Sequence, residues 1–303
     1  MGTISSTTSS STSLRTLIPD IYKLVGTKDG WFNTDVATAL SSNIASSLSK
    51  QLGVPRDRNK LRLSGMGPKC PRALWYSIRH PELQEALPPW AEIKYSFGHI
   101  LECLVIALAK AAGHEVTGEQ DELVVDGVTG HRDCVIDGCI VDVKSASSPS
   151  YKKFADGSIV HSDDFGYLDQ LDGYLLGSLH DDLVRTKDRA YLLAIDKQLG
   201  HMCLYEHHLR EASITKRITE YKRIVGLDVA PSCTCQSVPD GESGNYKLDI
   251  RASYSPFKHA CNPSLRTFLY SSGPRYLTKV VKRPRNKDGD IVEIDKHGQV
   301  VYN

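Results

Sequence analysis

The sequence predicts an α/β protein, because long helical patterns alternate with short runs that are typical of β-strands. An apolar helix is predicted over residues 91–113, a pair of strands over residues 130–144, and a second helix over residues 165–179. Two further strands are predicted over residues 190–196 and 202–207, on either side of a short polar turn. This order of elements favours a sheet with helices packed against it.

Composition restricts the class of protein without identifying a function. The 303 residues are 40% hydrophobic and 24% charged, which is ordinary for a soluble globular protein. No apolar run reaches the roughly 18 residues that a membrane helix needs. Eight cysteines are scattered along the chain, a pattern that indicates a reducing compartment, so we expect a cytoplasmic protein. With a net charge of +1, any binding of nucleic acid must depend on local basic patches and metal ions.

Four regions are expected. Residues 1–13 are rich in Ser and Thr and lack the order of a secretory signal, so we expect a disordered arm. Residues 14–90 form a predicted N-terminal helical region, in which Asn33 or Thr34 caps a helix and Pro71 opens the next. Residues 91–230 form the predicted core. Residues 231–303 are expected to be a cysteine-containing loop and a basic C-terminal extension, which ends in a hairpin over residues 291–302.

The strand pair at residues 130–144 contains the main candidate site. Asp137-Gly138 is a strong hairpin-turn signal between runs of Val, Ile and Cys. Side chains alternate along a strand, so Asp142 and Lys144 lie on one face, and Asp133 can lie opposite them on the first strand. Two carboxylates and an ammonium suit Mg²⁺ or Mn²⁺ chemistry. A solvated, salt-bridged face is the alternative, which the very apolar surroundings disfavour.

Two predicted helices carry polar residues within apolar surroundings. Glu102 lies four residues after Gly98, in the apolar helix at residues 91–113. A carboxylate there is costly unless it is paired or bound to metal, although an exposed polar stripe would also accommodate it. In the helix at residues 165–179, Tyr167, Gln170 and Tyr174 are spaced three and four apart and share one face.

Three weaker patterns flank these segments. Residues 115–126 are expected to form a hairpin with a turn at 118–121. Residues 145–157 are predicted to form a polar loop, whose Tyr151, Lys152 and Lys153 suit a nucleic-acid backbone or else a solvated surface. The helix predicted over residues 209–225 is basic and amphipathic, which is compatible with phosphate contact but typical of a solvated face.

Taken in order, four motifs resemble those of the RecB-like branch of the PD-(D/E)xK nucleases. They are Gly98-x-x-x-Glu102, the Gly-His-Arg-Asp run ending at Asp133, the Asp-Val-Lys run at residues 142–144, and Gln170-x-x-x-Tyr174. The resemblance implies an α-β-β-β-α-β core, in which helices flank a mixed central sheet. It also implies a divalent metal cofactor and hydrolysis of DNA phosphodiesters.

The resemblance also implies roles for particular residues. Five residues would be catalytic: Asp133, Asp142, Lys144, Gln170 and Tyr174. Four residues would bind the metal, Mg²⁺ or Mn²⁺: Glu102, Asp133, Asp142 and Val143. Gln170 and Tyr174 would also contact DNA, together with Tyr151, Lys152 and Lys153. Glu102 departs from the pattern, because many members carry His at this position; an oxygen ligand still suits Mg²⁺.

A second resemblance concerns the cysteines. Cys70-Pro71-Arg72 and the segment ending at Cys261 are similar to the framework that binds a [4Fe–4S] cluster in CRISPR-associated and helicase-linked RecB-like nucleases. Ala252 and Ser255 stand where two of the four thiolates would fall, so we expect no intact cluster and little iron. Cys233 and Cys235 are the alternative partners for an iron or zinc site.

The resemblance implies a metal-dependent deoxyribonuclease, most simply a stand-alone phage exonuclease that processes DNA ends for recombination or replication. DNA is the expected partner, with a single-strand annealing or recombination protein and a homo-oligomer as further candidates and no membrane. The alternatives are a structure-specific endonuclease, a CRISPR-adaptation-type nuclease, and a non-cleaving nucleic-acid-binding module with the same fold.

Overall fold

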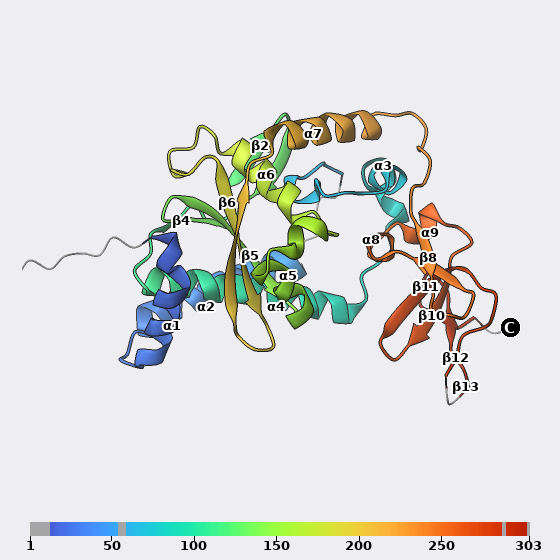
Figure 1. The fold of residues 1–303 in the computed structure, drawn as a ribbon, viewed down its shortest axis with the longest axis horizontal. Coiled ribbons are helices and arrows are strands. Elements are labelled where there is room, and N and C mark those ends of the chain that lie inside the picture. Colours follow the sequence, from blue (N-terminus) through green and yellow to red (C-terminus); the bar gives the residue numbers. More distant parts are fainter. Residues whose placement is uncertain (1–12, 54–58, 287–288, 302–303) are drawn as a thin grey trace, which may run out of the picture.

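A five-stranded mixed sheet is the central element of the computed structural model, which describes residues 13–53, 59–286 and 289–301 (Figure 1). Its strand order is β1-β4-β5-β6-β7; β5 and β6 are parallel, and the other neighbours are antiparallel. These strands are β1 Val116–Thr117, β4 Cys134–Ile136, β5 Cys139–Ala146, β6 Arg189–Asp196 and β7 Met202–His208. The predicted α/β class, with helices flanking a mixed sheet, is confirmed. The predicted disordered arm, apart from Ser13, lies outside the described residues.

The described helices are α1 Leu17–Thr27, α2 Thr34–Gly53, α3 Pro71–Arg79, α4 Pro89–Ala111, α5 Ser148–Ala155, α6 Tyr167–Gly177, α7 Glu211–Val225, α8 Ile250–Ser253 and α9 Lys258–Cys261. The helices predicted over residues 91–113, 165–179 and 209–225 are present as α4, α6 and α7, and further helices occur where none was predicted. Asn33 caps α2, because its side-chain oxygen accepts the backbone N–H groups of Asp35 and Val36. Among the described parts of the chain, no helix is both long and apolar enough to cross a membrane.

Different helices cover the two faces of the central sheet. Val141 and Val143 pack with α1 and α4 on one face. Ile140 and Ala146 pack with α6 and α7 on the other face. Since side chains alternate along β5, Asp142 lies on the face that α6 covers.

The structure differs from two of the strand predictions. The predicted hairpin over residues 115–126 is wrong, because β1 pairs with β4, whereas β2 Glu122–Val125 pairs with β3 Val128–His131. Asp126 and Gly127, with φ of 47° and 77°, make the tight turn between β2 and β3. Asp137 and Gly138 adopt φ of 49° and 79° and join β4 to β5 as predicted. The first strand predicted at residues 130–144 is interrupted after His131.

The polar loop predicted over residues 145–157 is also wrong for most of its length, because α5 occupies it. Pro149 lies in the first helical turn, where proline's fixed φ and missing N–H are tolerated. Phe154 is buried against the central core and anchors the helix. The polar composition favours a loop, but Phe154 and the partly buried Tyr151 pack this short helix against the central core.

A second five-stranded sheet follows α7, in a region where the sequence predicted a loop and a basic extension that ends in one hairpin. Its order is β14-β10-β11-β9-β8, and it lies beside α8 and α9 in Figure 1. The predicted terminal hairpin is reduced to a single bridge between Ile294 and Val300, because β14 pairs with β10 instead. Tyr302 lies outside the described residues. The strands are β8 Ser237–Pro239, β9 Tyr246–Leu248, β10 Arg266–Tyr270, β11 Gly273–Lys279 and β14 Glu293–Ile294, with a separate pair, β12 Arg285–Asn286 and β13 Gly289–Asp290.

Candidate active site

Asp142 and Lys144 form an ion pair in the interior of the central sheet. Asp142 is 0% exposed, and its Oδ2 lies 2.6 Å from Lys144 Nζ. An isolated carboxylate in such a core would be strongly destabilising, so the ammonium is required to keep it charged. Although burial alone would lower the pKa of Lys144, Asp142 and Asp133 raise it, so this side chain stays protonated.

Helix α6 supplies two polar groups to this pair. Gln170 Nε2 donates to Asp142 Oδ1 at 3.0 Å and lies 2.7 Å from the Tyr174 hydroxyl. Lys144 Nζ in turn donates to Gln170 Oε1 at 3.5 Å. Gln170 and Tyr174 are four residues apart and both are buried, so the helix period places them together above Asp142. The two motifs that the sequence placed on one strand and one helix therefore meet.

Asp133 and Glu102 complete a group of three carboxylates. Asp133 lies just before β4, and its Oδ2 accepts the Val143 N–H at 2.8 Å. Glu102 on α4 accepts a hydrogen bond from Gln120 Nε2 at 2.7 Å. Burial and the Asp142 charge raise the pKa of Glu102 to about 7, and burial, Asp142 and Glu102 raise the pKa of Asp133. The three acids therefore repel one another's negative charge.

The three carboxylates are of the chemical type that a hard divalent cation prefers, but they are not among the described residue groups whose ligand atoms already converge on one point. Asp142 Oδ2 is buried and has no directed hydrogen bond within the described parts of the chain, although the Lys144 ammonium is close. Carboxylate oxygens are the ligands that Mg²⁺ and Mn²⁺ prefer, and a cation among them would relieve the repulsion. Val143, the fourth predicted metal ligand, differs from the three carboxylates, because its side chain packs in the core and its N–H donates to Asp133. Only its carbonyl oxygen could contact a metal.

A cleft of about 1020 Å³ reaches this group at Glu102. It runs between α2, α3, α4 and the segment before α3, and it is large enough for more than a single ion. Glu102 and Glu119 contribute acidic groups. Basic side chains also line it, a combination suited to a polyanion approaching a metal site: Lys50, Lys60, Arg62 and Lys69.

The residues predicted to contact DNA from the segment after β5 do not line this cleft. On α5, Tyr151 is partly buried and packs against the central core. Lys153 Nζ donates to the Ser162 carbonyl at 3.3 Å, and Lys152 is exposed. The structure therefore brings Gln170 and Tyr174 to the carboxylates and leaves these three side chains on a separate helix.

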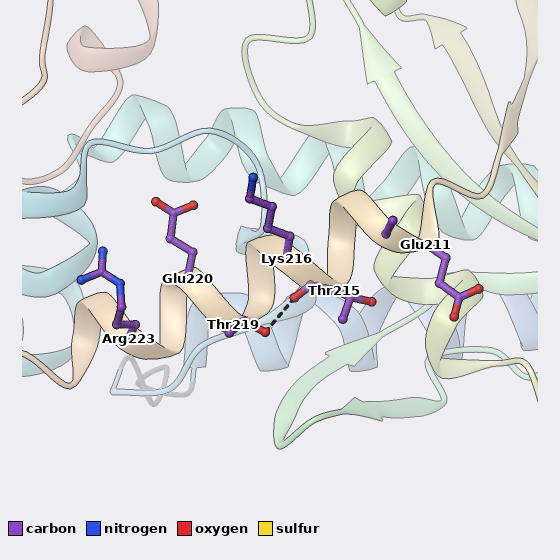
Figure 2. A pocket seen from close by; sticks show the side chains of 7 residues that line it. Glu211, Thr215, Lys216, Thr219, Glu220 and Arg223 are labelled. Atoms are coloured by element: carbon purple, nitrogen blue, oxygen red, sulfur yellow. Dashed lines mark hydrogen bonds between the residues drawn. The ribbon is translucent and has the colours of Figure 1, made fainter.

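The outer face of α7 carries both signs of charge. Figure 2 shows the shallow hollow along this helix, where Glu211 and Glu220 share the same stretch with Lys216 and Arg223. The opposite face of the helix buries Ile214 in the central core. The basic pattern seen in the sequence is therefore a mixed-charge surface, typical of a solvated helix face.

Two neighbours of the site were not identified from the sequence as functional. Gln120 reaches Glu102 from a turn in which Gln120 itself has φ of 58°. The Tyr167 ring lies 5.1 Å from Lys144 Nζ, a cation–π contact that helps to hold the ammonium. The shared helix face of Tyr167, Gln170 and Tyr174 was a usable signal for Tyr167. Nothing local could have linked Gln120 to Glu102, because they are 18 positions apart in the sequence, one on α4 and the other in the turn between β1 and β2.

The structure also brings the four candidate cysteine ligands together. Cys70, Cys233, Cys235 and Cys261 have sulfurs that all lie within 4.8 Å of one another. The segment between α7 and β8 places Cys233 and Cys235 beside the other two, as the alternative set of ligands requires. Elsewhere Cys134 and Cys139 are buried in the central sheet, as expected for small apolar side chains.

No protein-family model and no curated protein sequence matches the chain. Among solved structures, it is similar to SSO0001 at 16% identity and a TM-score of 0.41, with 73% of this chain and 95% of that chain covered. It is similar to a phage-related exonuclease from Haemophilus somnus 129PT at 15% identity and a TM-score of 0.40, covering 55% and 91% of the two chains. For an alkaline exonuclease from Laribacter hongkongensis, the identity is 12%, the TM-score 0.34, and the coverage 61% and 90%. Similarities this low carry no information about activity.

Proposed function

We propose that the protein is a divalent-metal-dependent nuclease that hydrolyses DNA phosphodiester bonds. The observation that carries this proposal is the fully buried Asp142, held between the Lys144 ammonium and the Gln170 amide. Asp133 and Glu102 add negative charge beside it, and a cleft with basic walls opens at Glu102. A purely structural ion pair would not require two further carboxylates whose charges oppose it.

The proposed chemistry divides among the side chains of the site. Asp133, Asp142 and Glu102 would hold the cation, which when bound would polarise a phosphodiester and acidify a water molecule. Lys144 remains charged, so it can hold the attacking water and stabilise negative charge that develops on the phosphate. Gln170 fixes the orientation of Asp142 through its amide, and Tyr174 fixes Gln170 in turn. The site is therefore preorganised before substrate binds.

Within this class, we favour an exonuclease that processes DNA ends for recombination or replication in a phage context. The support is the order and spacing of the four motifs, which resemble those of RecB-like nucleases. A single-strand annealing or recombination protein and a second copy of the chain are the proposed partners, in the cytoplasm of a host cell. A structure-specific endonuclease, a CRISPR-adaptation-type nuclease and a non-cleaving binding module are the alternatives.

One cleavage experiment separates these functions. The purified chain is incubated with linear duplex, covalently closed circular duplex and single-stranded DNA, each with Mg²⁺, with Mn²⁺ or with excess EDTA. An exonuclease degrades linear DNA progressively in the presence of metal and leaves the closed circle intact. Nicking of the circle would favour the endonuclease, and binding without cleavage in any metal would overturn the proposed enzyme.

Glu102→Gln is expected to raise the Mg²⁺ concentration for half-maximal cleavage roughly tenfold, because the neutral amide loses about 1.4 kcal/mol of attraction for the cation. Mn²⁺ should restore part of the activity, since it binds oxygen and nitrogen ligands more tightly. The measurement is the initial rate of cleavage titrated against each metal.

The matched control is Glu115→Gln, which removes one carboxylate from an exposed pair with Arg185. Its metal dependence should equal that of the unmodified protein. An unchanged Mg²⁺ requirement for Glu102→Gln would mean that Glu102 only lines the cleft and holds no metal.

A further inference from the structure

Four cysteines from three separate segments meet beside the N-terminus of α3. Cys70 immediately precedes α3, Cys233 and Cys235 lie between α7 and β8, and Cys261 ends α9. All four sulfurs lie within 4.8 Å of one another, and the Cys70 and Cys233 sulfurs are 3.8 Å apart. All four thiols are free, so no disulfide accounts for the convergence.

Two backbone N–H groups beside the cluster donate hydrogen bonds to its sulfurs. The Thr234 N–H donates to Cys70 Sγ at 3.3 Å, and the Cys235 N–H donates to Cys233 Sγ at 3.4 Å. Hydrogen bonds of this kind favour the thiolate, which is the form that ligates metal. Cys233 and Cys235 are also only two residues apart, so one short segment brings both sulfurs to the cluster.

We propose that these four cysteines hold one structural Zn²⁺ ion. With Zn–S bonds of about 2.3 Å, four sulfurs at the corners of a tetrahedron lie about 3.8 Å apart, which is the Cys70–Cys233 separation. A [4Fe–4S] cluster is a larger body and must hold its four thiolates farther apart than a single ion does. Four soft thiolates also exclude Mg²⁺ and Ca²⁺, which prefer oxygen ligands.

The ion connects regions that share little apolar contact. The core cluster at this junction has three buried members among the described residues, Ala73, Phe257 and Cys261, and the partly buried side chains around them include Tyr76 and the other three cysteines. In Figure 1, α3 lies next to α9, and the strands of the second sheet follow from the same region. Because so small a core contributes little, the metal supplies much of the free energy that fixes the C-terminal sheet beside α3. This zinc site is separate from the carboxylate site and does not depend on the nuclease proposal.

The test is metal analysis of the full chain, untagged and purified anaerobically without added metal. We expect about one zinc per chain, little iron, and no broad visible absorbance. Cobalt added after removal of zinc should give the intense visible bands of tetrahedral thiolate coordination. Four irons per chain with broad absorbance, or no bound metal at all, would overturn the proposal.

Variants assign the ligands. Cys70→Ser and Cys235→Ser should each lower the zinc content at least fivefold, and the thermal midpoint should fall with it. Cys203→Ser is the matched control, because Cys203 lies in β7 outside the cluster, and it should keep its zinc. If either ligand variant fails to fold, the cobalt spectrum of the unmodified protein still decides. Full zinc content in folded Cys70→Ser protein would also contradict the assignment.

Discussion

Asp142→Asn is expected to lower metal-dependent cleavage about 1000-fold or more while the protein stays folded. The substitution removes the central proposed metal ligand, and losing the charge stabilisation of a bound metal costs several kcal/mol in the transition state. Stability should change little or rise, because the repulsion from Asp133 and Glu102 disappears while Lys144 keeps some exposure to solvent. The measurements are single-turnover cleavage and the urea midpoint of unfolding.

Lys144→Ala distinguishes metal binding from the separate role proposed for Lys144 in the cleavage step. It should also lose cleavage, but Mg²⁺ should still raise its thermal midpoint, since no proposed ligand is removed. Asp142→Asn should lose that metal-induced stabilisation. Asp188→Asn is the control, because Asp188 is exposed and its side chain pairs only with Arg189 among the described residues. Turnover in Asp142→Asn within tenfold of the unmodified protein would refute the assignment.

Arg132→Met is expected to destabilise the fold by about 2–4 kcal/mol, which is near the range for breaking a buried ion pair. Arg132 is 1% exposed, and its guanidinium binds Asp121, Asp181 and the Gly118 carbonyl. The two carboxylates are 46% and 26% exposed, so water can solvate them after the change and the loss falls below the upper limit. Urea unfolding followed by circular dichroism measures the difference.

Arg185→Met is the matched control, because its pair with Glu115 is exposed on both sides. Its effect should stay below about 1 kcal/mol. Arg132 also immediately precedes Asp133, so Arg132→Met should weaken cleavage even at temperatures where the protein remains folded. Equal stability of the two variants would show that the buried guanidinium contributes no more than a surface ion pair.

The sequence determined the features that depend on neighbouring residues. The period of 3.6 predicted α4, α6 and α7, and the Asp137-Gly138 turn was predicted because few other dipeptides tolerate two positive φ angles. The same local rules placed Asp142 with Lys144 on one strand face, and Gln170 with Tyr174 on one helix face. The structure adds that these two faces are in contact.

Only the tertiary structure decided how distant segments meet. The pairing of β1 with β4 rather than with β2, and the strand order of the second sheet, could not be predicted locally, because burial of whole sheets selects among many possible pairings. Glu102 approaches Asp142 only when α4 packs on the sheet. Cys233 and Cys235 join Cys70 and Cys261 only when the chain after α7 returns to α3. Such convergence has no local signature, since it depends on contacts between residues far apart in the chain.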